Sequence, residues 1–238
     1  HSRKTVKIRQ IARYIRMHLE IFFVIGNQDK MILMEALVDI AGIHGQMLHL
    51  FPHWNWKKGE KVDVWAYYNN ADEVELFLNG KSLGRTSKTR SQLHAIWPEV
   101  DFESGRIEAV SYKDGREVAR AVRETAGPAA GLRLTADRNT IDADGYDLSF
   151  VMVEAVDAEG RTLPQADTML NFRVEGAGEL LGIDNGDAAD TLCMKGAVKP
   201  LFNGKALAVI RSFRGEKGTV TLKVSSELGD AELNIKTR

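Results

Sequence analysis

The fold is decided by the stretch Glu73-Val74-Glu75-Leu76-Phe77-Leu78-Asn79-Gly80-Lys81-Ser82-Leu83-Gly84, which has the pattern of a strand, a tight turn and a returning strand. Apolar residues are expected to point inward from the first strand, and Glu75 outward. Asn79-Gly80 is a strong two-residue hairpin signal, because both residues tolerate a positive φ angle. The stretch therefore predicts a β-hairpin with one buried face.

The same pattern continues on both sides of this hairpin. Before it, Val62, Val64 and Ala66 alternate with Asp63, Trp65 and Tyr67. After it, residues 106–112 alternate, Asp114-Gly115 provides another hairpin turn, and residues 117–123 return. Short strands with turn signals about every ten residues are typical of a β-sandwich.

A run of small residues at 126–131, with one proline, is the best candidate for a domain boundary. A second series of about seven predicted strands follows it, a number typical of an immunoglobulin-like domain. These strands are predicted at 132–136, 148–156, 171–174, 179–183, 206–212, 219–225 and 231–236. We therefore expect an all-β fold of two tandem immunoglobulin-like β-sandwiches, at 48–125 and 130–238.

Residues 1–47 differ from the rest of the sequence. Ile8, Ile11, Ile15 and Leu19 recur at helical spacing, and residues 31–43 form a second apolar stretch. One or two short helices are expected in this N-terminal segment. The apolar run at 21–25 is far shorter than the roughly 20 residues that cross a bilayer, so no membrane span is predicted.

Composition excludes some classes of partner. The 238 residues include 32 basic and 33 acidic side chains, which leaves a net charge of −1. Such a balance provides no long-range field to attract nucleic acid. Cys193 is the single cysteine, so no internal disulfide can form, and this leaves the cellular compartment undecided.

The most unusual stretch contains His53, Trp54, Asn55 and Trp56. A tryptophan ring can stack on a pyranose, and His or Asn can bind its hydroxyl groups, so these four residues are candidate sugar contacts. The competing interpretation is a strand that enters the first sandwich with tryptophan as core filler. A zinc site is not expected, because Pro52 prevents a helical pairing of His49 with His53 and no third ligand is evident.

Two acidic stretches, 142–145 and 184–187, have the composition of calcium loops. Neither follows the twelve-residue spacing of an EF-hand, and Asp, Asn and Gly are the residues that tight turns require. We interpret both as turns, and predict neither a metal nor another cofactor.

Residues 73–84, with 52–56 before them, resemble the domain that follows the catalytic barrel in bacterial family 2 glycoside hydrolases of the β-galactosidase type. The segments 134–138, 141–145, 148–151, 174–178, 182–187 and 202–207 are similar to the last, invasin-type immunoglobulin-like domain of such enzymes. The resemblance covers residues 47–238. It implies an accessory region whose partners are a catalytic barrel and, in addition, carbohydrate, and it favours a periplasmic or extracellular location.

The resemblance also bears on catalysis. In that family two glutamates on a TIM barrel perform hydrolysis, and a barrel needs at least about 200 residues. Only 47 residues precede the predicted sandwiches; Val38-Asp39-Ile40-Ala41-Gly42 is similar to the end of the barrel, but a Tyr-rich stretch that should follow is missing. We therefore predict no catalytic residues and no hydrolysis by this chain alone. A truncated or frame-shifted gene, a split enzyme and a diverged free-standing protein would all give this pattern.

Three functions are consistent with the sequence. The first is a non-catalytic accessory region that braces a β-galactosidase-like barrel. The others are a stand-alone carbohydrate-binding module, and a structural or adhesive tandem of immunoglobulin-like domains.

Overall fold

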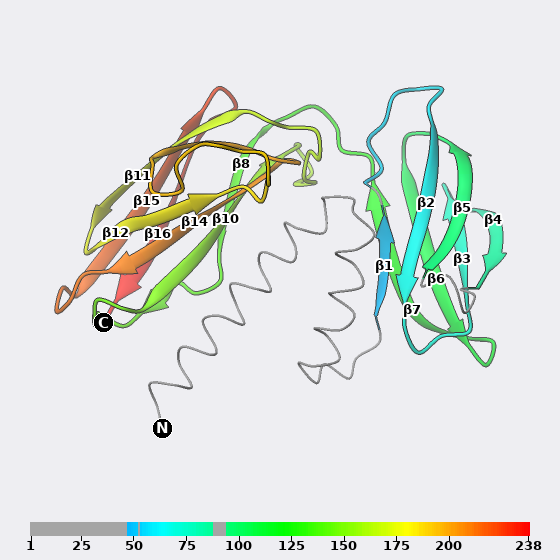
Figure 1. Ribbon diagram of the computed structural model, residues 1–238, viewed down its shortest axis with the longest axis horizontal. Coiled ribbons are helices and arrows are strands. Elements are labelled where there is room, and N and C mark those ends of the chain that lie inside the picture. Colours follow the sequence, from blue (N-terminus) through cyan, green and yellow to red (C-terminus); the bar gives the residue numbers. More distant parts are fainter. Residues whose placement is uncertain (1–46, 52, 88–93) are drawn as a thin grey trace. The chain divides into compact units, whose positions relative to one another are not determined.

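The computed structural model describes residues 47–51, 53–87 and 94–238 (Figure 1). The described residues belong to two compact units, 47–126 and 127–238, and each is considered by itself. The helices expected before residue 47 lie outside the described residues. Among the described residues there is no helix, so the predicted all-β fold is confirmed for that part of the chain.

The first unit is a sandwich of two antiparallel sheets. One sheet has the order β1-β2-β5, formed by β1 (Leu48–Phe51), β2 (Lys61–Tyr68) and β5 (His94–Asp101). The other has the order β4-β3-β6-β7, formed by β3 (Glu73–Leu78), β4 (Lys81–Thr86), β6 (Arg106–Lys113) and β7 (Arg116–Glu124). We call the first the β1-β2-β5 sheet below.

Alternation along the strands creates the core of this unit. Val64 and Ala66 of β2 point inward and meet Val74 and Leu76 of β3, and each of the four side chains is at most 1% exposed. Because both sheets contribute to one cluster of buried side chains, their inner faces pack together as in other β-sandwiches.

The predicted hairpin turns are confirmed. β3 and β4 are joined at Asn79-Gly80, where φ is 50° and 82°. β6 and β7 are joined at Asp114-Gly115, where φ is 50° and 72°. Two consecutive positive φ angles are the geometry that fits the right-handed twist of the flanking strands.

The second unit is also a sandwich. One sheet has the order β12-β14-β10-β8, formed by β8 (Gly131–Ala136), β10 (Leu148–Val156), β12 (Gly178–Asp184) and β14 (Lys205–Ser212). The other has the order β13-β11-β15-β16-β9, formed by β9 (Thr140–Ile141), β11 (Met169–Gly176), β13 (Val198–Pro200), β15 (Gly218–Ser226) and β16 (Gly229–Thr237). β9 pairs in parallel with β16, whereas the other ladders given for this unit are antiparallel.

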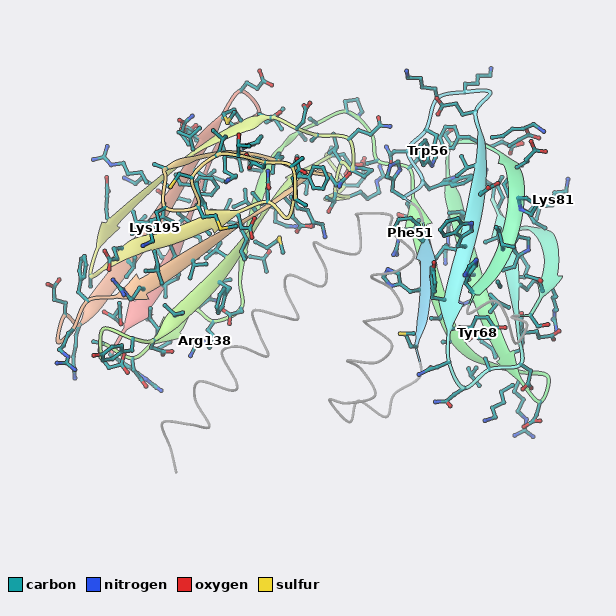
Figure 2. All side chains as sticks on the ribbon, in the orientation of Figure 1. Phe51, Trp56, Tyr68, Lys81, Arg138 and Lys195 are labelled. Carbon is teal, nitrogen blue, oxygen red and sulfur yellow. The ribbon has the colours of Figure 1, made fainter. Side chains whose placement is uncertain are left out.

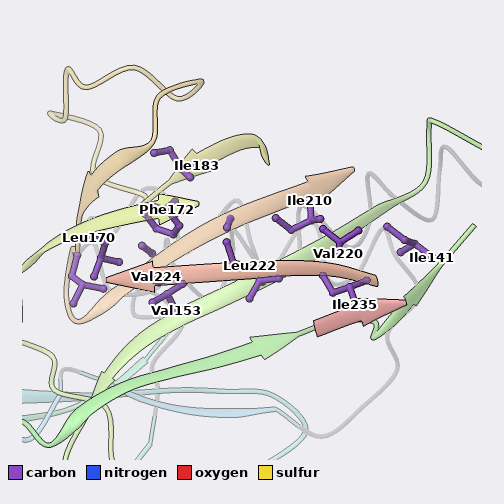
Figure 3. Close-up of a cluster of buried hydrophobic side chains, with 14 of the residues drawn as sticks. Ile141, Val153, Leu170, Phe172, Ile183, Ile210, Val220, Leu222, Val224 and Ile235 are labelled. Atoms are coloured by element: carbon purple, nitrogen blue, oxygen red, sulfur yellow. The ribbon is translucent and has the colours of Figure 1, made fainter. Parts of the chain in front are cut away.

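The core of the second unit lies between these sheets (Figure 3). Val153 and Ile210 of one sheet pack with Phe172, Leu222 and Val224 of the other. Branched aliphatic side chains dominate this cluster, as expected for strands with one buried face.

The acidic stretch 184–187 runs from the last residue of β12 into the loop that follows, and the turn itself lies at residues 188–189. The Asp184 carboxylate accepts hydrogen bonds from the backbone N–H groups of Asn185 and Gly186, at 2.7 and 3.0 Å. The Asn185 side chain accepts from the N–H of Asp187, and Asp187 accepts from that of Ala189. These side chains are therefore used to satisfy backbone donors within the loop.

Candidate functional site

The segment 53–56 follows β1 and is anchored by Trp54. The Trp54 side chain is 1% exposed and belongs to the core of the first unit. Its Nε1–H donates to the backbone oxygen of Glu103 at 2.8 Å, and its ring lies 5.3 Å from that of Phe102. Trp54 is therefore a core side chain whose polar atom is already satisfied.

Asn55 connects this segment to the end of the first unit. Its Nδ2 donates to the oxygen of Ala126 at 3.1 Å, and its Oδ1 accepts from the N–H of Ala126 at 3.0 Å. The amide thus pairs with both backbone groups of one residue, as a neighbouring strand would. Thr125 adds a bond from its hydroxyl to the oxygen of Trp54 at 2.8 Å.

His53 and Trp56 form a stacked pair. Their ring centres are 4.5 Å apart and their planes differ by 25°. The Nε1–H of Trp56 donates to the backbone oxygen of His53 at 2.9 Å, which closes a short turn. Both side chains are half-buried. Phe51 is the last residue of β1, and Figure 2 shows Trp56 beyond that end of the strand.

His53 is neutral near pH 7. Burial lowers its pKa below the ordinary value of 6.5, because desolvation disfavours the charged imidazolium. Its Nδ1 accepts from the N–H of Asn55 at 3.2 Å, so the hydrogen-bond pattern assigns the proton to Nε2. The pair thus combines a neutral donor with an indole ring, groups that suit a sugar hydroxyl and a pyranose face.

The structure therefore divides the four predicted sugar contacts. His53 and Trp56 lie together at the surface, whereas Trp54 is in the core and the Asn55 side chain is bonded to Ala126.

The sequence interpretation missed a second aromatic group, on the outer face of the β1-β2-β5 sheet. We call it the aromatic row; its members are Phe51, Trp65, His94 and Tyr67. Trp65 stacks with Phe51 at 6.4 Å and with His94 at 5.3 Å, and His94 lies 5.1 Å from Tyr67. The alternation of residues 62–67 was a usable signal, because it places Trp65 and Tyr67 opposite the core residues of β2.

Trp65 has a buried and unpaired N–H group. No hydrogen-bond acceptor in the described part of the chain contacts its Nε1, which is shielded from solvent. A buried donor without an acceptor costs about 1–3 kcal/mol. Such a group is uncommon in native proteins and calls for an explanation.

Arg123 of β7 is a partly buried charge that lies close to His49. Its guanidinium donates to the oxygen of Val122 at 2.9 Å, and no carboxylate of the described residues forms an ion pair with it. Burial lowers the pKa of Arg123 below its ordinary value. His49 of β1 lies close enough to respond: burial first and Arg123 second lower the pKa of His49 to about 4.

Two stretches of the chain match known protein families. Residues 132–233 match the family described as "Glycoside hydrolase family 2 C-terminal domain 5". Residues 59–119 match a domain of unknown function, DUF4982. This chain matches a C-terminal accessory region of family 2 glycoside hydrolases.

Individual proteins that are similar to the chain also belong to this class of enzymes. The chain is similar to the β-galactosidase BoGH2A of Bacteroides ovatus, with 46% identity over 80% of this chain and 22% of that protein. It is 33% identical to a putative β-glucuronidase of Formosa agariphila, over 79% of this chain and 18% of that protein. A crystal structure of a family 2 member from Bacteroides cellulosilyticus superposes with a TM-score of 0.73 at 32% identity, over 81% of this chain and 29% of that one. This accessory region thus spans about a fifth of the length of the curated relatives named here.

In residues 47–51, 53–87 and 94–238, no three His, Cys, Asp or Glu side chains are grouped as metal ligands. The same residues form no helix of the length and hydropathy needed to cross a membrane.

Proposed function

We propose that this chain is the accessory part of an enzyme that hydrolyses β-galactosides or related glycans, and that its sandwiches brace the catalytic barrel. The observation that carries the proposal is the 46% identity to a β-galactosidase over 191 residues. That length is greater than the length of either unit, so the match includes residues of both. The domain limits that we propose are 48–125 and 130–238.

A domain exchange tests this proposal. In the B. ovatus β-galactosidase, the region that matches this chain would be replaced by the corresponding residues of this chain, to give a chimera. We expect the chimera to hydrolyse nitrophenyl β-galactoside, and the isolated chain to show no turnover. Loss of activity in a soluble, folded chimera would contradict the bracing role, and turnover by the isolated chain would contradict the assignment as an accessory region.

We also propose that the His53–Trp56 pair contacts sugar at the edge of the barrel site. The supporting observation is that these two side chains are half-buried, stacked and neutral, whereas Trp54 is in the core. In the chimera, Trp56→Ala is then expected to raise KM and to lower the melting temperature only slightly. An unchanged kcat/KM would exclude the contact.

The two alternative functions have distinct expectations. A stand-alone carbohydrate-binding module would be retarded in affinity electrophoresis through a galactan gel. A structural or adhesive tandem would bind a protein and show no affinity for sugar.

A further inference from the structure

The chain contains three Asn-Gly pairs, at 79–80, 185–186 and 203–204. Such pairs are chemically labile, and asparagine is among the thermolabile residues. Because glycine has no side chain to hinder it, its backbone nitrogen can attack the amide carbon of the preceding asparagine. The three pairs differ in how freely this nitrogen can react, and the structure therefore distinguishes them.

Two of the pairs are protected. The N–H of Gly186 donates to the Asp184 carboxylate at 3.0 Å, and the Asn185 side chain before it is 1% exposed. The N–H of Gly204, a buried residue, donates to the oxygen of Ala166 at 2.9 Å. A nitrogen that is held in this way can attack only after its loop has opened, and local opening costs free energy.

Asn79-Gly80 is the unprotected pair. Both residues are exposed at the tip of the β3–β4 hairpin, where the chain turns with two positive φ angles. Among the described residues, no acceptor contacts the N–H of Gly80. The attacking nitrogen therefore faces solvent, as expected for the second residue of a two-residue turn.

The Asn79 amide also holds the loop before β6. Its Nδ2 donates to the oxygen of Ser104 at 3.2 Å, and its Oδ1 accepts from the N–H of Arg106 at 2.8 Å. Gly105 lies between them, and a Cβ atom there would overlap with the Asn79 amide oxygen. Both bonds are at exposed positions, so opening them costs less than opening a buried loop.

This loop is connected to the candidate site. The Trp54 side chain donates to the oxygen of Glu103, and the Thr125 hydroxyl donates to the oxygen of Trp54. The backbone N–H of Thr125 donates to the oxygen of Gly105 at 2.8 Å, and the N–H of Gly105 donates to the Thr125 hydroxyl oxygen at 3.1 Å. Asn79 thus holds one end of a loop whose other contacts anchor Trp54.

We infer that Asn79 is a site of spontaneous self-modification, and that its deamidation loosens the loop that anchors Trp54. The Gly80 nitrogen forms a bond to Cγ of Asn79, and the bond from Cγ to Nδ2 breaks. The proton of the Gly80 nitrogen passes through water to the departing nitrogen, which leaves as ammonia. Water then opens the succinimide ring to give aspartate or isoaspartate, so water is the only other reactant.

Either product changes the contacts of the loop. The amide donor to Ser104 is replaced by a carboxylate oxygen, which faces the backbone oxygen of Ser104 without a hydrogen between them. Isoaspartate also adds a backbone carbon to the two-residue turn, whose geometry sets the pairing of β3 with β4. The modification is therefore expected to free residues 104–106.

Reaction rates in the unmodified chain test the first part of the inference. The chain would be incubated at mildly alkaline pH, folded and in urea, and its three Asn-Gly peptides followed by mass spectrometry. In the folded chain, Asn79 should deamidate at least about tenfold faster than Asn185 and Asn203, whose glycine nitrogens must first leave a hydrogen bond. In urea the three rates should converge. Equal rates in the folded chain, or the slowest rate at Asn79, would overturn the assignment.

Asn79→Asp reproduces one product and tests the second part. It should lower the melting temperature by about 4 °C, because one hydrogen bond is replaced by two facing oxygens. Hydrogen exchange in the peptide that contains residues 102–106 should be faster than in the unmodified chain.

Asn203→Asp is the matched control. It makes the same change in another Asn-Gly turn, where φ is 51° and the asparagine side chain forms no hydrogen bond among the described residues. This variant should shift the melting temperature by about 1 °C or less and leave the exchange of residues 102–106 unchanged. Equal effects of the two variants, or unchanged exchange of residues 102–106 in Asn79→Asp, would overturn the link from Asn79 to the loop.

Discussion

Lys199 donates from its Nζ to the Asp190 carboxylate over 2.9 Å, and the two side chains are 2% and 9% exposed. A second bond runs from the same Nζ to the oxygen of Leu192 at 2.8 Å. Lys199 is on β13, and the other two residues belong to the loop between β12 and β13. The pair therefore fixes this loop from inside the second unit, and the bond from Lys199 is the leading cause of the lowered pKa of Asp190.

Breaking this pair is expected to be costly. Lys199→Met leaves the Asp190 carboxylate buried without a counter-charge, which should reduce the free energy of unfolding by about 3 kcal/mol. Lys199→Met combined with Asp190→Asn removes both charges and should be less destabilising than the sum of the single variants. Urea denaturation of the four proteins measures this coupling, and strictly additive losses would contradict the role given to the pair.

Two glycines of the second unit should respond differently to alanine. Gly204 and Gly215 have φ angles of 75° and 77°, so alanine is similarly strained at both. A Cβ atom at Gly204 would lie 2.0 Å from the oxygen of Leu163, whereas at Gly215 it would meet nothing within 4 Å. Gly215→Ala should therefore cost about 1–2 kcal/mol, and Gly204→Ala clearly more. Thermal melts of both variants check the order, which equal losses would refute.

The stability of the first unit should depend on pH through His49. Its pKa is about 4 in the folded chain against 6.5 ordinarily, so the unfolded chain binds the proton more readily between these values. The contribution is complete above pH 6.5, is lost as the pH falls towards 4 and is constant below that, with a total of about 3 kcal/mol.

Denaturation series between pH 4 and 7 measure this effect. His49→Gln has no titrating group at this position, so its profile should be flatter over the same range. If the two profiles were parallel, the acid sensitivity would have to come from other groups, such as His53 and His94, whose pKa values are also lowered by burial.

Replacing the two tryptophans of the 53–56 segment should reduce the free energy of unfolding by different amounts. Trp54→Ala removes a core side chain and should reduce the free energy of unfolding by about 3–5 kcal/mol. Trp56→Ala removes a half-buried ring and should cost less in stability. Denaturation followed by circular dichroism checks the order, and a larger loss for Trp56→Ala would contradict the placement of Trp54 in the core.

Much of the fold could be predicted from the sequence, because local chemistry determines it. The turns at Asn79-Gly80 and Asp114-Gly115 and the alternation in β2 were sufficient to place the strands around them. The prediction missed β5, β9 and β13. In β5 a register shift near Glu99, with a φ angle of 50°, interrupts the alternation, and β9 and β13 are too short to show any pattern.

The candidate site could be predicted only in outline. Composition indicated that residues 53–56 were unusual, but the burial of Trp54 depends on Phe102 and Glu103, which are distant in sequence. The pairing of Asn55 with Ala126 spans 71 residues and has no local signal. The aromatic row was equally hidden, since it combines side chains from three strands.

The double bond between Asn55 and Ala126 also has a mechanical meaning. Ala126 is the last residue of the first unit, so a pull on the chain beyond it is shared between the Asn55 amide and the backbone that leads back to β7. Asn55 therefore lowers the load on β7, the final strand of the first unit. Tension from the C-terminal side is borne by the segment beside Trp54, which is the most deeply anchored tryptophan of that unit.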